Sequence, residues 1–473
     1  MEALDRWIEH QYRHSAAAMM RSISPVGIVK HRPGFAQTVK PRKGAIVASP
    51  VLGAYDPEPD YFFHWYRDSA VVIDALRLLF EDASVDCNAL SHFGDFVEFS
   101  LSLQGLDGRA LSGSASWRDS IAPDYRQFVR TDEDLAAVHG EAVAGETRVN
   151  PDGTLDLSKW PRPQNDGPPM RALTLLRWRL SARFDAGLNQ AVDALLRADL
   201  EYTRRHWHEN CFDIWEEEKG VHYYTLRVAA AALEAGAGWY EQRGKSAEAL
   251  ACRAEAAEIL QILDGYWRED LHFYRSRVLE TNAASAKELD ISVIFAALHA
   301  AGSGETHSAR DPRVHATLAR LEALFAAEYA INRNRAERAP AMGRYAGDVY
   351  YSGGAYYFST LAAAEFCFRA AAQSRPPAAA TASASAAPAS TAVAPASTAV
   401  PPAAAGAPTV KSLIERGDAF LATVRAFTPP SGDLSEQFDQ HTGVQRSAQQ
   451  LAWSYAAFIS CAEARRQVIQ RNA

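Results

Sequence analysis

Three consecutive carboxylates beside a tryptophan are the first feature of the sequence that could do chemistry. Trp215 precedes Glu216, Glu217 and Glu218, and an apolar run with helical spacing follows at about 222–242. Adjacent carboxylates repel one another and an indole lowers the local polarity, so we expect a raised pKa for at least one of the three. A carboxyl that stays protonated near neutral pH is what a general acid in glycoside hydrolysis requires. The alternative is the acidic first turn of a helix, where the helix dipole favours carboxylates.

Four further segments combine charged and aromatic residues, and each precedes a predicted helix. They cover residues 61–69, 160–168, 343–354 and 434–439. In the first segment, Arg67 and Asp68 could together grip a sugar, because neighbouring hydroxyls each donate and accept hydrogen bonds. Each segment alone also fits a structural role, such as a helix cap formed by Asp166 ahead of Pro168. Five such loops in one chain favour a binding site.

Helical periodicity dominates the sequence, and no series of alternating strands competes with it. Together with one at the N-terminus, the pattern predicts about twelve helices, the others at about 67–82, 88–104, 168–182, 187–207, 221–243, 245–267, 287–301, 311–330, 353–373, 410–427 and 444–467. Short and long connections alternate, and the long ones, at 105–167, 331–352 and 428–443, are rich in Gly, Pro, charged and aromatic residues. Long ordered loops usually carry function. We therefore expect an all-α toroid of helix pairs, with a site in its mouth where the long loops share one rim.

Composition and charge limit the class of protein. The chain has 473 residues, of which 48% are hydrophobic, and a formal net charge of -8. This acidic balance argues against nucleic acids and anionic membranes as partners, because both require basic surface. No run of about 18 apolar residues occurs, and residues 1–21 contain no signal-peptide core, so we expect a cytoplasmic protein with no membrane span. We also expect a monomer.

The cysteines form no recognisable framework. Cys87, Cys211, Cys252, Cys367 and Cys461 are odd in number, scattered, and without the spacing of a CxxC motif. We therefore expect free, mostly buried thiols in a reducing compartment. No cluster of His, Cys and Asp has the spacing of metal ligands, so neither a metal nor a cofactor is predicted.

One segment differs from the rest in composition. From Gln373 to about Pro408 the chain is nearly all Ala, Pro, Ser and Thr, with Ala-Ser-Thr-Ala-Val at both 389–393 and 396–400. Because such a segment has nothing bulky to bury, we expect a disordered surface loop within a single domain spanning residues 1–473. The alternative is a linker between two domains, although the piece at 410–473 is small for an independent domain.

Eight motifs follow one another along the chain: Gly44–Pro50, Pro59–Asp68, Arg162–Pro168, Asp213–Glu217, Gly343–Asp348, Leu361–Glu365, Ser435–Gln437 and Leu451–Ala457. In order and interval they resemble glycoside hydrolase family 15, and within it the fungal-type glucoamylases, over about residues 3 to 460. The resemblance implies an (α/α)6 barrel, which agrees with the helix count obtained from periodicity.

The resemblance also implies roles for two carboxyls. Glu216 matches the general acid that protonates the glycosidic oxygen, and Glu436 matches the general base that activates water from the opposite face. Inversion requires these carboxyls to stand roughly 6.5–9.5 Å apart. Glu436 lies between Ser435 and Gln437, so we expect it to stay ionised.

Further residues match the family's sugar-binding positions. The resemblance implies that Arg67 and Asp68 hold the hydroxyls of the glucose at the non-reducing end, and that Glu217 reaches the next sugar. It also implies that Arg344 and the backbone around Ile214 and Trp215 contact the same terminal glucose. The aromatic residues that match the walls of the pocket are Trp65, Trp160, Trp215 and Trp453.

The expected function is inverting, exo-acting hydrolysis of terminal α-1,4-linked glucose from the non-reducing ends of maltodextrins, soluble starch or glycogen. The product would be β-D-glucose, and the partner an α-glucan or malto-oligosaccharide. One alternative is a glucosidase of the same family that prefers α-1,6 links, as in isomaltose and dextran, or trehalose. A more distant alternative is a catalytically silent glucan-binding or regulatory protein, although both Glu216 and Glu436 are present.

Overall fold

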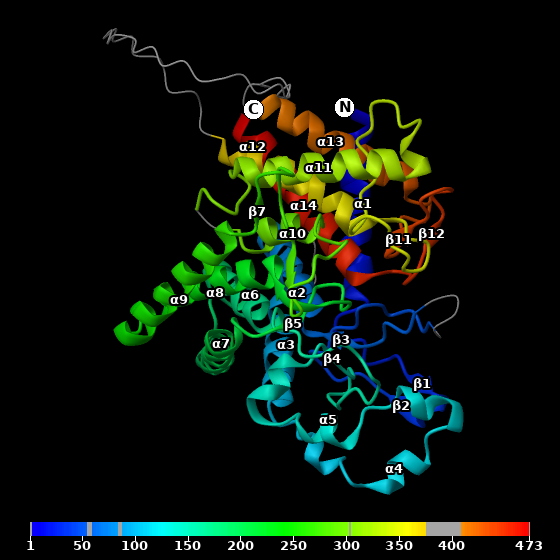
Figure 1. Cartoon of the computed structure of the whole chain (residues 1–473), viewed down its shortest axis with the longest axis vertical. Helices are drawn as coiled ribbons and strands as arrows, with labels where there is room; N and C mark the ends of the chain where they lie inside the picture. The colour runs from blue at the N-terminus through cyan, green and yellow to red at the C-terminus, as the bar shows by residue number, and fades with distance from the viewer. Residues whose placement is uncertain (1, 54–58, 84–87, 302–303, 375–407, 473) are drawn as a thin grey trace.

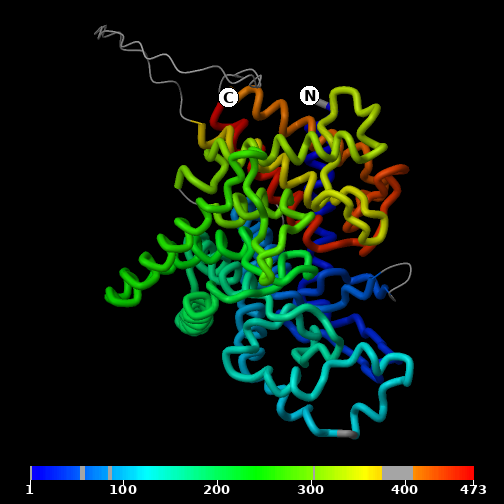
Figure 2. The backbone as a smooth tube through the Cα atoms, viewed as in Figure 1, coloured from blue at the N-terminus to red at the C-terminus, as the bar shows by residue number. Residues whose placement is uncertain are grey.

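The computed structural model describes residues 2–53, 59–83, 88–301, 304–374 and 408–472 (Figure 1). The Ala/Pro-rich insert predicted at about 373–408 falls almost wholly outside the described residues. Twelve of the described helices have eight or more residues, and they match the predicted helices one for one. The smooth tube in Figure 2 shows the same chain path without the element symbols.

Six helices form a closed inner ring. They are α2 (Tyr66–Asp82), α6 (Gly167–Ser181), α8 (Tyr223–Glu241), α10 (Ser292–His299), α12 (Tyr357–Gln373) and α14 (Ala452–Asn472). Each one packs against the next in this order, and α14 packs back against α2, which closes the ring.

The outer layer consists of α1 (Glu2–Met20), α3 (Ala89–Leu103), α7 (Ala186–His206), α9 (Ser246–Asp264), α11 (Pro312–Glu328) and α13 (Val410–Phe427). Each outer helix packs on one inner helix that adjoins it in sequence, except that α1 packs on α14. Alternation of inner and outer helices around a closed ring confirms the predicted (α/α)6 barrel.

The two layers differ in how their sequences bury apolar side chains. The outer helix α9 buries a single stripe, made of Ala249, Cys252, Ala256, Ile259 and Leu263, at the alternating spacing of three and four residues that one helix face requires. The inner helices α8 and α12 are buried almost all round and rich in alanine. Small side chains let an inner helix approach both ring neighbours and its outer partner at once.

Short antiparallel strands decorate the loops. The pairs are β1 (Lys30–Arg32) with β2 (Gln37–Val39), β3 (His64–Trp65) with β4 (Arg148–Val149), and β7 (Trp267–Arg268) with β8 (Phe273–Tyr274). The triplets are β5 (Cys211–Phe212), β6 (Lys219–His222) and β9 (Arg277–Leu279), and β10 (Ala355–Tyr356), β11 (Gln437–Phe438) and β12 (Gln445–Arg446). Strands β3, β6 and β10 lead directly into inner helices, so the strands fix where those helices start.

The long connection predicted at 105–167 folds into short turns. It contains the helices α4 (Ala115–Asp119) and α5 (Asp132–Ala136) and three 3-10 turns at Gly108–Ala110, Pro123–Phe128 and Gly140–Gly145. Figure 1 shows α4 and α5 beside β1 and β2, at the end of the molecule opposite the two termini. Small apolar clusters hold this lobe together, one of them formed by Phe35, Ile121 and Val129.

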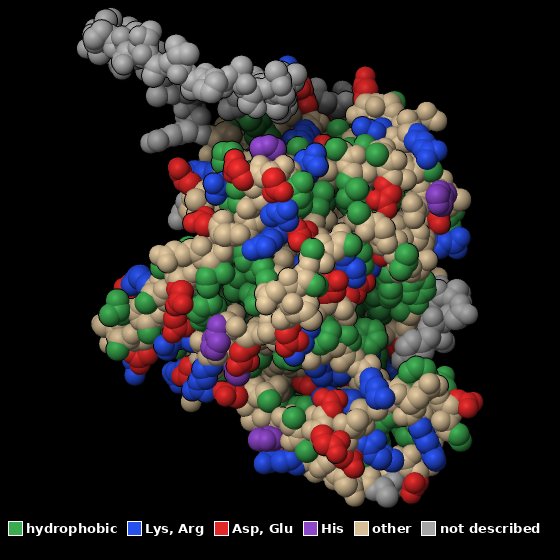
Figure 3. All heavy atoms as spheres, viewed as in Figure 1, with side chains coloured by type: hydrophobic (Ala, Val, Ile, Leu, Met, Phe, Trp, Pro, Cys, Tyr) green, Lys and Arg blue, Asp and Glu red, His purple; other side chains and the backbone are tan. Residues whose placement is uncertain are grey.

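None of the described helices is both long and apolar enough to cross a bilayer. Acidic and basic side chains are interspersed over the face seen in Figure 3.

Replacing Trp178 by alanine should destabilise the fold by roughly 3–5 kcal/mol, as expected for removing a large buried aromatic side chain. Trp178 on α6 is 0% exposed, stacks on Phe93 with ring centroids 4.5 Å apart, and donates its indole N–H to the carbonyl of Ile73 at 2.9 Å. Urea-induced unfolding would measure the change in free energy.

Leu180→Ala is the matched control, because Leu180 lies on the same helix and is 90% exposed. Its unfolding free energy should change by less than about 0.5 kcal/mol. Equal losses in the two variants would contradict the packing described for the α2–α3–α6 contact.

Candidate active site

Every residue predicted to act or to bind in the site lines one cavity of about 230 Å³. These residues are Trp65, Arg67, Asp68, Trp160, Ile214, Trp215, Glu216, Glu217, Arg344, Glu436 and Trp453. They come from segments spread over almost four hundred positions. The fold therefore brings together side chains that the sequence keeps far apart.

The inner helices run in parallel and present one end to this cavity. Arg67 and Asp68 lie in the first turn of α2, Trp453 in the first turn of α14 and Phe358 in the first turn of α12. The last turns of α2, α6 and α10 line a different cavity of about 330 Å³. The positive ends of the helix dipoles thus point toward the cavity that Glu216 and Glu436 line, and they favour negative charge there.

Glu216 lies in the turn between β5 and β6 rather than in a helix. Its backbone is left-handed, with φ of 65°, and its N–H donates to the carbonyl of Asp213 at 2.9 Å. The Asp213 carboxylate also accepts the N–H of Glu217 at 2.9 Å. The alternative of a helical first turn is therefore wrong, because β6 intervenes and α8 begins at Tyr223. A left-handed backbone disfavours a residue with a Cβ, so the surrounding hydrogen bonds are needed to hold Glu216 in place.

Three N–H donors fix the carboxyl of Glu216. The indole of Trp65 donates to Oε1 at 2.9 Å, and the guanidinium of Arg67 reaches the same oxygen at 3.3 Å. The indole of Trp160 donates to Oε2. With both oxygens engaged, the carboxyl has one orientation at the cavity wall.

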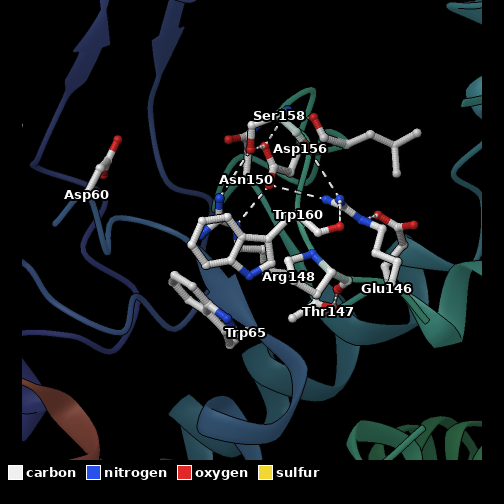
Figure 4. A network of polar contacts seen from close by, with 12 residues as sticks. Asp60, Trp65, Glu146, Thr147, Arg148, Asn150, Asp156, Ser158 and Trp160 are labelled. Atoms are coloured by element: carbon white, nitrogen blue, oxygen red, sulfur yellow. Dashed lines mark hydrogen bonds and ion pairs between the residues drawn. The ribbon is translucent and has the colours of Figure 1, made fainter. Parts of the chain in front are cut away.

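A buried arginine supports both indoles from behind. The guanidinium carbon of Arg148 lies 3.6 Å from the ring centroid of Trp160 and 4.8 Å from that of Trp65. Its Nε donates to Asp156 at 2.8 Å and its Nη2 to Ser158 at 3.2 Å, as the dashed lines in Figure 4 mark. Arg148 belongs to the lobe at 105–167, and it thus fixes the positions of the two tryptophans whose indoles bind Glu216.

Arg67 is shared by three carboxyls. Its guanidinium lies 3.0 Å from Asp166, 3.5 Å from Asp68 and 3.3 Å from Glu216. Burial raises the pKa of Asp68 to about 6, although the positive charge of Arg67 opposes the shift. Within the described residues, Arg67 Nε and Asp68 Oδ2 have no hydrogen-bond partner, but both atoms are almost inaccessible. The two residues line the cavity, so a cationic donor group and a carboxyl acceptor group stand side by side at its wall.

Glu436 faces the same cavity from the segment that precedes β11. Tyr61 donates its hydroxyl to Oε1 at 3.3 Å, and Ser447 donates to Oε2. Burial nevertheless raises the pKa of Glu436 to about 7. The expectation that Glu436 stays ionised is corrected, because burial of the carboxyl outweighs the hydrogen bonds that favour its charged form. Its polar sequence neighbour Ser435 donates instead to the carbonyl of Gln437.

Glu217 belongs to a separate charged network. Arg344 donates to it at 3.0 Å, Lys287 at 2.7 Å and Tyr345 at 2.5 Å. Asp348 holds Arg344 by a bidentate pair, with both contacts at 2.6 Å. Such a pair fixes the plane of the guanidinium, so Arg344 presents a rigid donor at the cavity edge.

Aromatic rings close the base of the cavity. Trp453 stacks on Phe358 with centroids 4.7 Å apart and an interplanar angle of 11°, and Phe295 contacts Trp453 at 5.4 Å. Trp453 and Phe295 also line the cavity at the other end of the ring. The rings thus form a floor between the two cavities.

Several residues of the site were not predicted from the sequence. Tyr61 and Tyr350 line the cavity, and their hydroxyls are 2.7 Å apart. Both lie in the polar, aromatic segments at 61–69 and 343–354, so the sequence indicates that these segments bind a ligand but not what the two tyrosines do. Ser447 carries no such signal, since it reaches Glu436 only through the turn that pairs β11 with β12.

The described residues contain no group of three or more His, Cys, Asp and Glu that could hold a metal ion. Four of the five cysteines are described, and all four are free and buried.

The sequence model of glycosyl hydrolases family 15 matches residues 31–93 and 133–463. The chain belongs to this family. Its curated relatives include Glucoamylase 1 of Rhizopus oryzae, which is 27% identical over 98% of this chain and 71% of its own length. Another is the glucoamylase of Neurospora crassa, which is 29% identical over 90% of this chain and 64% of its own length.

Solved structures of family 15 share the architecture. The glucoamylase of Hypocrea jecorina is 23% identical, with a TM-score of 0.75 over 98% of this chain and 73% of that one. This likeness supports the (α/α)6 barrel as the family fold.

Glu436→Gln should stabilise the protein at alkaline pH. The pKa of Glu436 is raised from 4.5 in its ordinary state to about 7 in the fold, so ionising it costs folding free energy. This cost is absent below about pH 4.5 and complete above about pH 7. We expect a gain of up to about 3 kcal/mol at pH 8 that disappears at pH 4.

Urea unfolding of the variant and the parent protein at pH 4, 6 and 8 would measure this difference. A stability difference that does not change with pH would contradict the raised pKa.

Proposed function

We propose that the protein is an inverting, exo-acting glucoamylase, which releases β-D-glucose from the non-reducing ends of α-1,4-linked glucans. One observation carries the proposal: Glu216 and Glu436 line the same small cavity, together with Arg67 and Asp68. Two carboxyls facing one sugar-sized space are what acid–base hydrolysis of a glycoside needs.

Glu216 is the proposed general acid. Trp65 and Trp160 orient its carboxyl toward the glycosidic oxygen of a bound chain. Glu216 shares the single positive charge of Arg67 with Asp68 and Asp166. As the general acid, Glu216 gives its carboxyl proton to the glycosidic oxygen while the bond from that oxygen to the anomeric carbon breaks.

Glu436 is the proposed general base. It takes a proton from a water molecule that attacks the anomeric carbon from the side opposite the leaving group, which inverts the configuration. Its pKa of about 7 lies close to neutral pH, where a base combines adequate basicity with a substantial ionised fraction. Tyr61 and Ser447 stabilise the ionised form by hydrogen bonding to each oxygen.

The cavity floor accounts for exo action. Trp453 and Phe358 block the far side, so a glucan chain can enter only by its end. At that end, the guanidinium of Arg67 can donate to one hydroxyl while the carboxyl of Asp68 accepts from its neighbour. Glucose is therefore cleaved one unit at a time.

Glu216→Gln and Glu436→Gln should each lower the turnover of maltotriose by about 10²–10⁴-fold, the usual contribution of a general acid or base. Sugar binding should be nearly intact, because an amide keeps the size and much of the hydrogen bonding of the carboxyl. Initial rates and maltotriose affinity of each variant would measure both effects. Turnover equal to that of the parent would remove the residue from its role.

Proton NMR of the anomeric signals at early times tests the reaction itself, with maltotriose, maltose, isomaltose and trehalose in parallel. β-Glucose as the first product from maltotriose is expected. β-Glucose from isomaltose or trehalose alone would keep the mechanism and change the substrate. α-Glucose first, or no glucose from any substrate, would contradict the proposal.

Ser447→Ala should shift the acid limb of the pH–rate profile to higher pH. Ser447 donates a hydrogen bond to Glu436, which favours the ionised form and lowers its pKa. Without that bond the pKa of Glu436 rises, by about one unit for a hydrogen bond to a charged group. The pH dependence of kcat/KM for maltose would measure the shift.

Ser454→Ala is the control for this shift, because its hydroxyl donates to the Ser435 carbonyl at 2.8 Å and not to Glu436. Its acid limb should coincide with that of the parent protein.

A cytoplasmic location and a monomeric state stay predictions. The four free cysteines support the location.

A further inference from the structure

A third cavity adjoins the catalytic one at Trp160 and is lined mainly by aromatic side chains. It measures about 320 Å³, and its lining consists of Phe35, Tyr125, Phe128, Arg148, Ser158, Lys159 and Trp160. We name Phe35, Tyr125 and Phe128 the aromatic platform. Trp160 lines both cavities, and its indole binds Glu216. The platform is therefore continuous with the wall of the catalytic site.

Two rings of the platform are unusually exposed. Phe128 is 52% exposed and Tyr125 37% exposed. Isolated exposed apolar residues are common, but neighbouring exposed aromatics that line a hollow indicate a binding surface. The rings of Tyr125 and Phe128 are in contact, with centroids 6.4 Å apart and nearly perpendicular planes.

The platform is held rigidly in place. The Tyr125 ring lies so close to Gly34 that a Cβ at that position would come within 2.5 Å of it, and it packs edge-on against Phe35. The carbonyl of Phe128 accepts the N–H of Lys159, the residue before Trp160, at 2.6 Å. A ligand that bridges Trp160 and Phe128 would meet a preformed surface and lose little free energy in ordering it.

This surface is a feature of the chain rather than of the family sequence model. The model matches residues 31–93 and 133–463, so Tyr125 and Phe128 fall in the segment that it leaves unmatched. Phe35 and Trp160 fall inside it. Two residues of the platform thus lie outside the region that the family model matches, next to Trp160, which lies inside it.

We infer that the aromatic platform binds the glucose units of an α-glucan chain that extend beyond the catalytic cavity. The inference rests on the proposed function for the identity of the chain. Sugar rings present flat C–H faces that pack on aromatic rings, whereas charged ligands need unpaired opposite charges. Arg148 at the base is paired with Asp156 at 2.8 Å, and the other basic side chain of the lining, Lys159, is exposed to solvent. Four of the seven lining side chains are aromatic, so the surface suits the flat faces of a sugar chain.

A length preference follows from this placement. A disaccharide is held within the catalytic cavity, so its hydrolysis does not use the platform. A longer chain also covers Phe128 and gains binding there. The platform therefore favours long maltodextrins over maltose, and it acts on chain affinity rather than on the bond-breaking step.

The test compares kcat/KM for maltose and maltoheptaose in Phe128→Ala, Phe128→Tyr and Leu250→Ala. Leu250 is 71% exposed and belongs to the outer helix α9, which Figure 1 shows away from the lobe that contains α4 and α5, so it controls for loss of an exposed apolar side chain. Phe128→Ala should lower the maltoheptaose value about fivefold, mainly through KM, and leave maltose unchanged. Phe128→Tyr keeps a flat ring and should restore most of the value.

A binding measurement separates this inference from the proposed function. In the Glu436→Gln background, calorimetry with maltoheptaose should show about fivefold weaker binding when Phe128→Ala is added, and the same binding when Leu250→Ala is added. Unchanged maltoheptaose binding and kcat/KM in Phe128→Ala would overturn the platform while leaving the catalytic proposal standing. Weaker binding in Phe128→Ala, together with no hydrolysis by the parent protein, would support the platform and overturn the catalytic proposal.

Discussion

A single buried guanidinium organises the mouth of the barrel. Arg67 cannot lose its proton, so its burial requires carboxylate partners, and it contacts Asp68, Asp166 and Glu216 from three different segments. Those contacts join the start of α2, the loop before α6 and the β5–β6 turn around one charge. The same interaction links folding to chemistry, because the carboxyl proposed as acid is one of the partners that keep Arg67 stable in a dry site.

Much of the fold could be predicted because its rules are local or periodic. Helical spacing in the sequence placed the twelve main helices, and the alternation of short and long loops indicated that one rim carries the site. The site residues were predicted through family motifs, and the ring explains why the motifs must converge: Arg67 and Trp453 stand in the first turns of two adjacent inner helices. Parallel inner helices bring all such first turns to the same end.

Other features depended on contacts that no local pattern reveals. The charge state of Glu436 follows from burial and from Ser447, eleven positions away, rather than from its polar sequence neighbours. The turn that carries Glu216 was ambiguous with a helix start, because an acidic run suits both and strand pairing with β9 decides between them. The aromatic platform could not be predicted for a related reason. Only the backbone hydrogen bond between Lys159 and Phe128 places Phe128 beside Trp160.

The closed floor under the catalytic cavity also determines the order in which products leave. Trp453 and Phe358 leave a freed glucose no exit except the mouth through which the chain entered. The shortened chain fills that mouth after cleavage, so it must withdraw before the monosaccharide can diffuse out. Each catalytic cycle then ends with the polymer detached, and successive units are removed by separate encounters rather than by sliding along one strand. Processivity is thus incompatible with this geometry, and any tendency to attack one chain repeatedly must come from surfaces outside the pocket.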